Sequence, residues 1–450
     1  MEAEDVRRVF ETILPDAVLL EVIEAAKLQE RERKLDALRF LRAMVIAAST
    51  VYGGRQADVA RLYFESGAPD IVRGGFYRWF GPPLETAMVD VSNRALAYAR
   101  SQPVDLPGWL GFYVRDWHIV DSTTISLHGR LKEEYPGTGD YAALKVHKRF
   151  SVGIGTTIEY HLSPAREHDA PHLKVDASWA GLGLLVDLGY ASIQLLRDCE
   201  EHGVKYVIRL KENWKPKVDR IMRGTLKGAF EPGSDLRELL ERKVLKLDGK
   251  VLSAAVCIGT GRNAVNSRLV AVPTDKGYCF YLTNLPGEVG PRQVADLYRV
   301  RWEIESNNKL DKSCCSLDKI GARTGPAARA LVHASMVSST IVCLLAHHHQ
   351  RSEAPPPEPN TERTEPPIHP QTLARVVGSA ATSIAAAMSM RGAAAKKEWA
   401  RLAALFTYHG KDPNWRRRPS ILDQLRGWRV TPGQPRHFRA ASVSGRSGLK

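Results

Sequence analysis

The segment YRVRWEIESNNKLDK places a carboxylate among cationic side chains at helical spacing. In a helix with roughly 100° per residue, one arc of about 60° contains Tyr298, Arg301, Glu305 and Lys312. The carboxylate can bind a metal ion, the two cations can bind phosphate oxygens, and the phenol can hydrogen-bond or stack against a nucleotide. Taken alone, the pattern is more typical of a solvent-exposed ion-pair face.

Two aspartates elsewhere in the chain change that balance. Asp121 stands within the β-branched run HIVDSTTI, and Asp187 ends the apolar run LLVD. A carboxylate in or at the end of a buried strand is costly unless it is paired or bound to metal, although a single aspartate there is usually a turn residue. Together with Glu305 they can hold two Mg²⁺ ions about 3.5 to 4 Å apart for an in-line phosphoryl displacement. We therefore predict that all three are catalytic metal ligands.

The overall charge favours a polyanionic partner. The net charge is +14 and the pI is about 9.5, which suits nucleic acid or an anionic membrane surface. Residues 411–450 hold ten Lys and Arg against two Asp, so a solvated basic tail would explain much of the excess without any DNA.

Composition and targeting signals point to a folded cytoplasmic protein. The 450 residues leave room for roughly two to four domains, and 44% hydrophobic with 25% charged residues is ordinary globular composition. The six cysteines form no CxxC pair and are interpreted as reduced thiols. The first residues lack a signal peptide. Residues 330–346 carry no Asp, Glu, Lys or Arg but fall short of a membrane span, so we expect a buried core helix there and no membrane association.

The hydrophobic periodicity changes along the chain. Residues 5–105 read as helical, and 55–80 form a helix, turn, helix pattern whose aromatic residues could face DNA or form the core of a bundle; the sequence favours neither. From Gly111, three β-rich runs predict a meander. A strand ending at Asp187, a helix and another strand follow, then β-rich sequence to about 285 and helix from Pro291. Seven prolines within 355–370 indicate a linker.

These changes predict six segments. They are a helical DNA-binding domain (1–105), a first part of the catalytic core (106–212), a β-rich insertion (213–289), a second part of the core (290–350), a Pro-rich linker (351–372) and a basic C-terminal region (373–450).

The chain resembles DDE transposases of insertion-sequence family four. Their last motif is Tyr, two residues, Arg, three residues, Glu, six residues and Lys, which Tyr298 to Lys312 satisfy without a gap. DST at 121–123 and DLGY at 187–190 match the first and second motifs, and LSPAREHDAPHL, VIRLKEN and YLTNLP match connecting stretches. The resemblance covers residues 110–345 well and the flanks weakly.

This resemblance implies an α/β fold with a ribonuclease H-like catalytic core, interrupted by the β-rich insertion. It implies cleavage at element ends and strand transfer into target DNA by a two-metal mechanism, with two Mg²⁺ ions as cofactor and Mn²⁺ as a substitute. Arg301, Lys312 and Tyr298 are then DNA phosphate-binding residues. The expected partner is double-stranded DNA, at terminal inverted repeats and target sites, bound by a homodimer in the nucleoid of a bacterial cytoplasm.

Four further positions bear on this interpretation. Leu188 replaces the arginine usual in the family and removes one possible phosphate contact. Asp169, beside His168, is expected to cap the following helix. Trp214 is expected to pack rather than to stack on an extruded base. His347–His349 is expected to be an exposed helix end.

Two other functions fit the same sequence. One is a nuclease of this fold that cleaves without joining, and the other is a transposase-derived DNA-binding protein that has lost catalysis.

Overall fold

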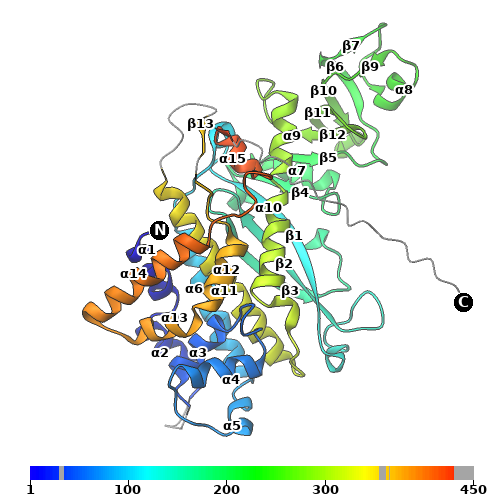
Figure 1. The fold of residues 1–450 in the computed structure, drawn as a ribbon. Coiled ribbons are helices and arrows are strands. Elements are labelled where there is room, and N and C mark those ends of the chain that lie inside the picture. Colours follow the sequence, from blue (N-terminus) through cyan, green and yellow to red (C-terminus); the bar gives the residue numbers. More distant parts are fainter. Residues whose placement is uncertain (30–34, 354–360, 364, 430–450) are drawn as a thin grey trace, which may run out of the picture.

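The computed structural model describes residues 1–29, 35–353, 361–363 and 365–429. The described residues form helices, one large mixed sheet and two small two-stranded sheets, which confirms the predicted α/β class. Helices from both ends of the sequence gather at one end of the molecule, and the strands extend away from them to the other (Figure 1).

The sheet has ten strands in the order β3-β2-β1-β4-β5-β12-β11-β10-β6-β8. β1, β2 and β3 form the predicted antiparallel meander, while β4 and β5 run parallel to β1. The strands are β1 (Trp117–Ser126), β2 (Ala143–Ser151), β3 (Thr156–Pro164), β4 (Gly183–Val186), β5 (Lys205–Arg209), β6 (Lys217–Arg223), β8 (Ser234–Asp235), β10 (Leu252–Ile258), β11 (Val265–Thr274) and β12 (Gly277–Thr283).

The β-rich stretch between 213 and 289 continues this sheet. β12 pairs antiparallel with β5, with Tyr281 opposite Arg209. Through this pairing β12, β11, β10, β6 and β8 extend the sheet of the first five strands. A small two-stranded sheet of β7 (Thr225–Leu226) and β9 (Leu245–Lys246) and the short helix α8 (Leu236–Glu241) lie at the far end.

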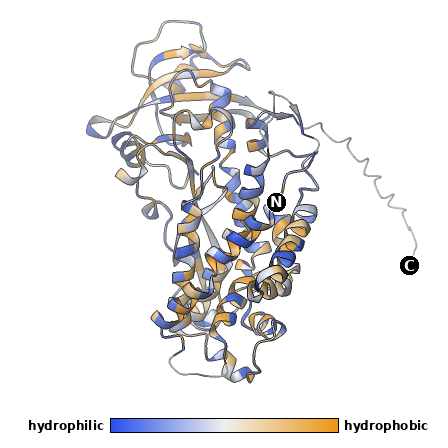
Figure 2. Cartoon of the chain, turned by 90° about the vertical axis from the view of Figure 1, so that its left-hand side faces the viewer, coloured by the Kyte–Doolittle hydropathy of each residue, from blue (hydrophilic) through white to orange (hydrophobic). Residues whose placement is uncertain are grey.

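Helices from the two ends of the chain share one hydrophobic core around α11. Apolar residues alternate with polar ones along these helices (Figure 2). The helices are α1 (Ala3–Ile13), α2 (Asp16–Ala25), α3 (Ala37–Ile46), α4 (Gln56–Glu65), α5 (Arg73–Tyr77), α6 (Pro82–Arg100), α11 (Gly325–Ser352), α12 (Pro370–Ser379), α13 (Ala381–Ser389) and α14 (Gly392–His409). The predicted N-terminal segment is helical as expected, and its core is continuous with that of the C-terminal helices.

The pattern at 55–80 forms α4 and the five-residue α5. Phe76 and Phe80 are buried and pack edge-on against Phe40 of α3. These two aromatic residues therefore belong to the core, while Arg73 and Arg78 remain exposed.

Helix α11 contains the charge-free run at 330–346. It is long and apolar enough to cross a membrane by length and composition, but 89% of its most apolar window is buried inside the protein. Burial confirms the expected core helix. The expectation for the three histidines near its end was wrong, because the helix continues to Ser352 and His347 is buried, within 3.1 Å of the Pro103 carbonyl.

The predicted Pro-rich linker coincides only partly with the structure. Its first two residues belong to α11, and α12 begins at Pro370. A short strand, β13 (Thr361–Glu362), pairs with β14 (Trp428–Arg429), which follows the short helix α15 (Ile421–Leu425). Positions 354–360 and 364 lie outside the described residues, as do 430–450 of the predicted basic region.

The central strands are covered by helices on both faces. Leu184 and Val186 pack in a cluster with α7 (Ile193–Glu201), whereas Leu185, between them, packs with α9 (Pro291–Arg299). Successive side chains of a strand point to opposite faces, so this alternation identifies the two faces. Gly183 is required on β4, because a Cβ there would lie 2.3 Å from the ring of Trp117 on β1.

The helix predicted around Glu305 is not one straight helix. α9 ends at Arg299 and α10 (Trp302–Lys309) starts after a break, and a π-helical turn (Leu310–Cys314) follows. The assumption of a uniform 100° per residue was therefore wrong across this segment, since both irregularities rotate the residues that follow them.

A buried ion pair connects the π-helical turn to the sheet. Lys148 of β2 and Asp311 are both fully buried, with 2.6 Å between Nζ and Oδ2. Lys148 also donates to Asn307 Oδ1 at 2.7 Å, and Ser339 of α11 donates to Asp311. The network satisfies both charges and ties β2, α10 and α11 together.

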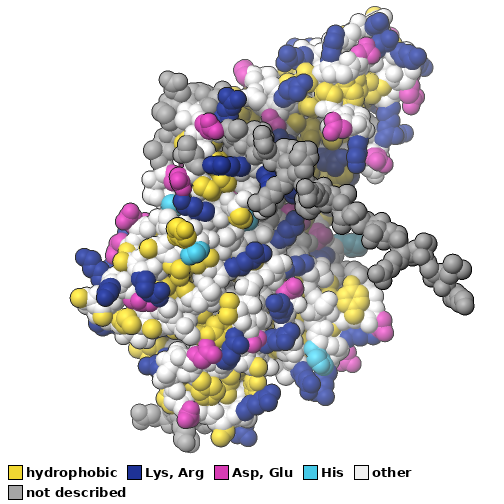
Figure 3. Space-filling view, viewed as in Figure 1, with side chains coloured by type: hydrophobic (Ala, Val, Ile, Leu, Met, Phe, Trp, Pro, Cys, Tyr) yellow, Lys and Arg dark blue, Asp and Glu magenta, His cyan; other side chains and the backbone are white. Residues whose placement is uncertain are grey.

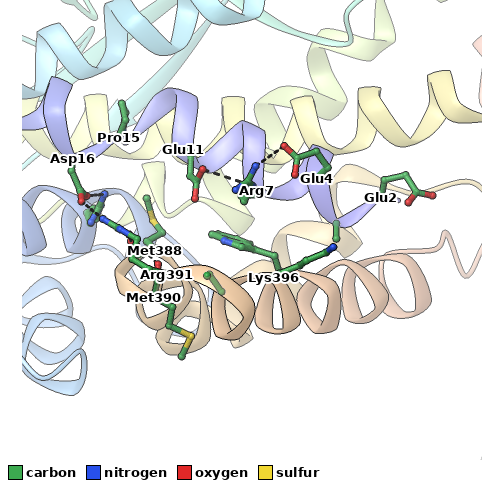
Figure 4. Close-up of a pocket in the computed structure, with 15 residues that line it drawn as sticks. Glu2, Glu4, Arg7, Glu11, Pro15, Asp16, Met388, Met390, Arg391 and Lys396 are labelled. Atoms are coloured by element: carbon green, nitrogen blue, oxygen red, sulfur yellow. Dashed lines mark hydrogen bonds and ion pairs between the residues drawn. The ribbon is translucent and has the colours of Figure 1, made fainter.

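A separate open cavity of about 870 Å³ lies between α1 and α14 (Figure 4). Arg7 bridges Glu4 and Glu11 on its α1 side. Phe10 stacks on Trp399 beneath it, with ring centroids 5.7 Å apart. This packing attaches the C-terminal helices to the N-terminal ones.

We predict that Lys148→Met destabilises the fold by about 3–5 kcal/mol, because it leaves the Asp311 carboxylate buried without its cation. Urea unfolding measures the change. The double variant Lys148→Met/Asp311→Leu should recover much of the loss, and Arg242→Ala, which breaks an exposed pair with Glu238, should change stability by at most about 0.5 kcal/mol. A single Lys148→Met variant as stable as the wild type would contradict the assignment.

A second prediction concerns acid sensitivity. His333 Nδ1 of α11 lies 2.6 Å from the Tyr160 hydroxyl, and burial lowers the pKa of His333 to about 4. In the unfolded chain His333 binds a proton with a pKa of about 6.5, whereas in the folded protein it stays neutral until about pH 4. The free energy of unfolding therefore decreases as pH falls from about 6.5 to 4. In His333→Gln, the loss of unfolding free energy between pH 7 and 4.5 should shrink by about 1–3 kcal/mol. The exposed control His409→Gln should retain the wild-type profile.

Candidate functional site

The two aspartates occupy neighbouring positions on parallel strands. Val120 of β1 is paired with Val186 of β4, so the next residues, Asp121 and Asp187, are side by side where β4 ends. Neighbouring strands lie about 4.8 Å apart, which brings the two carboxylates onto the same part of the sheet. Asp121 is partly buried and Asp187 is exposed.

Glu305 approaches from the helical layer. Glu305 lies on α10, which packs against β1. Asn308, about one helical turn after Glu305, donates a hydrogen bond from Nδ2 to Asp121 Oδ2 at 3.0 Å. Arg301 pairs with Glu305 at 2.6 Å. The helix thus brings the third predicted ligand to the face of the sheet that carries Asp121.

The pKa of Asp121 is set by burial and by the charged groups around it. Burial raises its pKa, and the nearby Asp187 carboxylate acts in the same direction. A hydrogen bond from the Ser122 backbone and the charges of Lys148 and Arg301 oppose the rise. A partly buried carboxylate beside another carboxylate is an environment in which added positive charge is favourable.

Arg301 is a cation that acts on all three carboxylates. Its guanidinium pairs with Glu305, it acts electrostatically on both aspartates, and its Cζ lies 5.8 Å from the centre of the Tyr298 ring. Asp121, Asp187 and Glu305 do not have ligand atoms that all lie within 4.8 Å of one another. Among the described residues, a group of three histidines meets that criterion.

The other two residues of the predicted phosphate clamp lie differently. Tyr298 is 7% exposed, packs on Tyr281 and donates a hydrogen bond to the Val186 carbonyl at 3.4 Å. It is better placed to hold α9 against the end of β4 than to meet a DNA strand. Lys312 lies in the π-helical turn, is partly exposed and pairs with no residue in the described part of the chain.

Asp169 does not cap a helix, contrary to expectation. It precedes a 3-10 turn at Ala170–His172 but makes no side-chain cap bond there. Its carboxylate accepts a hydrogen bond from Ser122 at 2.8 Å and pairs with Lys145 at 2.9 Å. Trp214 packs against the core of the β-rich part, as expected.

Sequence reasoning missed Asn308 and Lys148. Lys148 is the cross-strand partner of Asp121, so the two side chains share a face of the sheet. The signal available was a lysine within the strand KVHKRF, where a buried charge requires a partner. No local pattern singled out Asn308.

Comparisons with known proteins identify the family of the chain. The family model described as a transposase DDE domain matches residues 115–341, which include all three carboxylates. The transposase for insertion sequence element IS231C of Bacillus thuringiensis is 26% identical over 242 residues, covering 45% of this chain and 50% of the relative. The putative transposase for IS4SA of Synechocystis is 22% identical over 235 residues, covering 50% and 59%.

A third relative, the transposase for IS1151 of Clostridium perfringens, is 21% identical over 340 residues, covering 66% of this chain and 71% of the relative. The chain spans about half the length of the first curated relatives it matches. The family match covers half of the chain and contains the site described above, so the chain belongs to the DDE transposases, of the type found in insertion-sequence family four.

Proposed function

We propose that this protein is a DNA transposase that cleaves DNA at element ends and transfers the ends to target DNA. The observation that carries the proposal is the register of β1 and β4, which aligns Asp121 with Asp187 under the helix that bears Glu305. The family match over 115–341 supports the same activity.

The carboxylates fit two Mg²⁺ ions, with Mn²⁺ as a substitute. Carboxylate oxygen is the donor that Mg²⁺ prefers, and Asp121 lies near a second carboxylate, Asp187, whose negative charge a bound cation would offset. When bound, such ions supply a metal-activated oxygen nucleophile and stabilise the leaving oxygen of a phosphodiester. Asp121, Asp187 and Glu305 would hold them, and Asn308 would keep the Asp121 carboxylate oriented.

Arg301 and Lys312 would bind phosphate oxygens near the cleaved bond. The guanidinium of Arg301 is held beside Glu305, where it can also reach an approaching phosphate, and Lys312 has an ammonium free of protein partners among the described residues. Tyr298 would act by positioning Arg301. Leu188, partly exposed beside Asp187, provides no cation where the family usually has one.

The fold of the catalytic part is proposed to be ribonuclease H-like. Three antiparallel strands followed by two parallel ones in the order 3-2-1-4-5, with helices on both faces, support it. The strands from β6 to β12 then form the insertion between Asp187 and Glu305. The other predicted segment boundaries belong to the same proposal, except that α11 and α12 occupy the two ends of the predicted linker.

Double-stranded DNA is the proposed partner, bound by a homodimer because two element ends must be brought together. Lys and Arg side chains are spread over the face in Figure 3 and are frequent around the β-rich end, where Lys217, Arg220 and Arg223 of β6 are exposed. Arg73 and Arg78 of the N-terminal helices are exposed as well. The proposed setting is the bacterial nucleoid.

We predict that Asp121→Asn, Asp187→Asn and Glu305→Gln each reduce Mg²⁺-dependent cleavage by at least about 100-fold, because each removes a charged metal ligand. The substrate is a donor DNA that carries the sequences flanking the coding region. The exposed variant Glu201→Gln is the control, and thermal unfolding confirms that every variant is folded. Unchanged Mg²⁺-dependent cleavage in all three variants would contradict the proposal that these carboxylates are catalytic.

The same assay separates the two alternative functions. A nuclease of this fold would cleave the donor DNA but give no joined product with a target plasmid. A catalytically silent protein would bind the ends and produce neither cleavage nor joining.

We also predict that Lys312→Ala weakens DNA binding and lowers the slope of log affinity against log salt by about one, because one phosphate contact is lost. Lys397→Ala, which removes an exposed lysine on α14, should retain the wild-type slope. Fluorescence anisotropy over a series of salt concentrations measures both. Equal slopes for Lys312→Ala and the wild type would exclude the phosphate contact.

A further inference from the structure

A group of three histidines lies on the face of the sheet opposite to Asp121. Ser122 is paired with His147 of β2, which is paired with His161 of β3, so these side chains share a face, while Asp121 and Lys148 share the other. His172 joins them from the turn between β3 and β4. One potential ligand atom from each histidine lies within 4.8 Å of the other two.

The nitrogens of these rings divide into two sets. His147 Nε2 lies 2.9 Å from Ser163 Oγ, and His172 Nε2 lies 3.0 Å from a Glu167 carboxylate oxygen. His147 Nδ1 is buried, has no hydrogen-bond partner among the described residues and lies 3.8 Å from Asp169 Oδ1. His161 Nε2 and His172 Nδ1 face each other at 2.8 Å. Metal-binding histidines typically engage their second nitrogen in this way, often with a carboxylate.

The surroundings also suit a bound ion. A cavity of about 80 Å³ is lined by the three histidines and by Tyr190, whose buried hydroxyl makes no hydrogen bond within the described residues. Burial and the two neighbouring histidines lower the pKa of His147. A neutral imidazole is the form that binds metal.

We propose that His147, His161 and His172 form a binding site for a divalent transition metal, with Zn²⁺ as the preferred ion. Three imidazole nitrogens with a fourth position open to water are a common zinc ligand set, and nitrogen donors do not suit Mg²⁺. The ligand atoms are His147 Nδ1, His161 Nε2 and His172 Nδ1. Tyr190 is placed to hydrogen-bond a water at the fourth position.

Coordination requires a local rearrangement of the rings. The rings of His147 and His172 are stacked, with centroids 3.9 Å apart and an interplanar angle of 24°. In stacked rings the nitrogen lone pairs lie in two nearly parallel planes, so they do not converge on one metal position. His161 is exposed and His172 is partly exposed, so both can turn toward His147, and the ion replaces their mutual hydrogen bond.

Metal bound here would fasten the segment 165–173 to β2 and β3. That segment carries Asp169, which accepts a hydrogen bond from Ser122, the neighbour of Asp121. A metal ion here would act by positioning that segment, and the site differs in donor type and in sheet face from the proposed carboxylate site. It does not depend on the proposed transposase activity.

The test uses the full-length protein stripped of metal by a chelator and titrated with Zn²⁺ by calorimetry, in excess Mg²⁺ to occupy the carboxylate site. We expect one equivalent of Zn²⁺ to bind. His161→Ala and His172→Ala should weaken binding by more than about 100-fold, and Glu167→Gln by about 10-fold, because outer partners of ligands contribute about that much. Both histidines are accessible, so these variants should fold.

His168→Ala is the matched control, because this exposed histidine lies in the same segment outside the group. Its Zn²⁺ affinity should equal that of the wild type, and Asp187→Asn should bind Zn²⁺ equally well. Co²⁺ in place of Zn²⁺ should give the intense visible absorption of a tetrahedral nitrogen site. The proposal is overturned if His161→Ala/His172→Ala binds Zn²⁺ like the wild type, if His168→Ala loses binding equally, or if Co²⁺ shows only a weak octahedral spectrum.

Discussion

The buried pair of Lys148 and Asp311 is the interaction on which the geometry of the candidate site depends. Two charges removed from water are tolerated only when each is fully hydrogen-bonded, and Asn307 and Ser339 complete that requirement here. Because Lys148 is the cross-strand neighbour of Asp121, the pair fixes α10 over the strand that bears this aspartate. The position of Glu305 relative to the two aspartates therefore depends on this buried pair, together with the hydrogen bond from Asn308 to Asp121.

The sheet separates two chemically different groups of side chains. Oxygen donors gather on the face covered by α9 and α10, and nitrogen donors gather on the opposite face beside Trp179 and Tyr190. The alternation of a β-strand causes this separation, since neighbouring residues such as Asp121 and Ser122 point to opposite sides. Hard cations and borderline transition metals prefer different donors, so the two faces can select different ions.

The helical part is joined to the sheet through a single core. Helices before β1 and helices after α11 pack on one another, and Arg391 near the start of α14 pairs with Asp16 near the start of α2. Residues of β1, β2 and β3 belong to the same cluster. Helices proposed to bind DNA are therefore connected to the carboxylates by continuous packing, which limits how far one can move relative to the other.

The sequence by itself determined the order and type of the main elements up to α11, whereas the helices α12, α13 and α14 of the C-terminal region were not anticipated. Three β-rich runs identified the meander, and the apolar run before Asp187 identified β4. The spacing of Arg301 and Glu305 placed both on one helical face, and the two side chains form an ion pair. These signals are local, because they depend on residues within one or two turns of helix or one strand. The tyrosine, arginine and glutamate of the last motif were found in the same way.

Only the tertiary structure decided which distant residues meet. In the folded protein the helix is interrupted before Trp302, and Lys312 lies in a π-helical turn. Asp169 accepts a hydrogen bond from Ser122, and His347 is buried. The tertiary structure paired Lys148 with Asp311, 163 positions away, and gathered histidines from two strands and a turn. Periodicity records which face of an element is buried, but the partner on that face comes from strand register and helix packing, which depend on the whole chain.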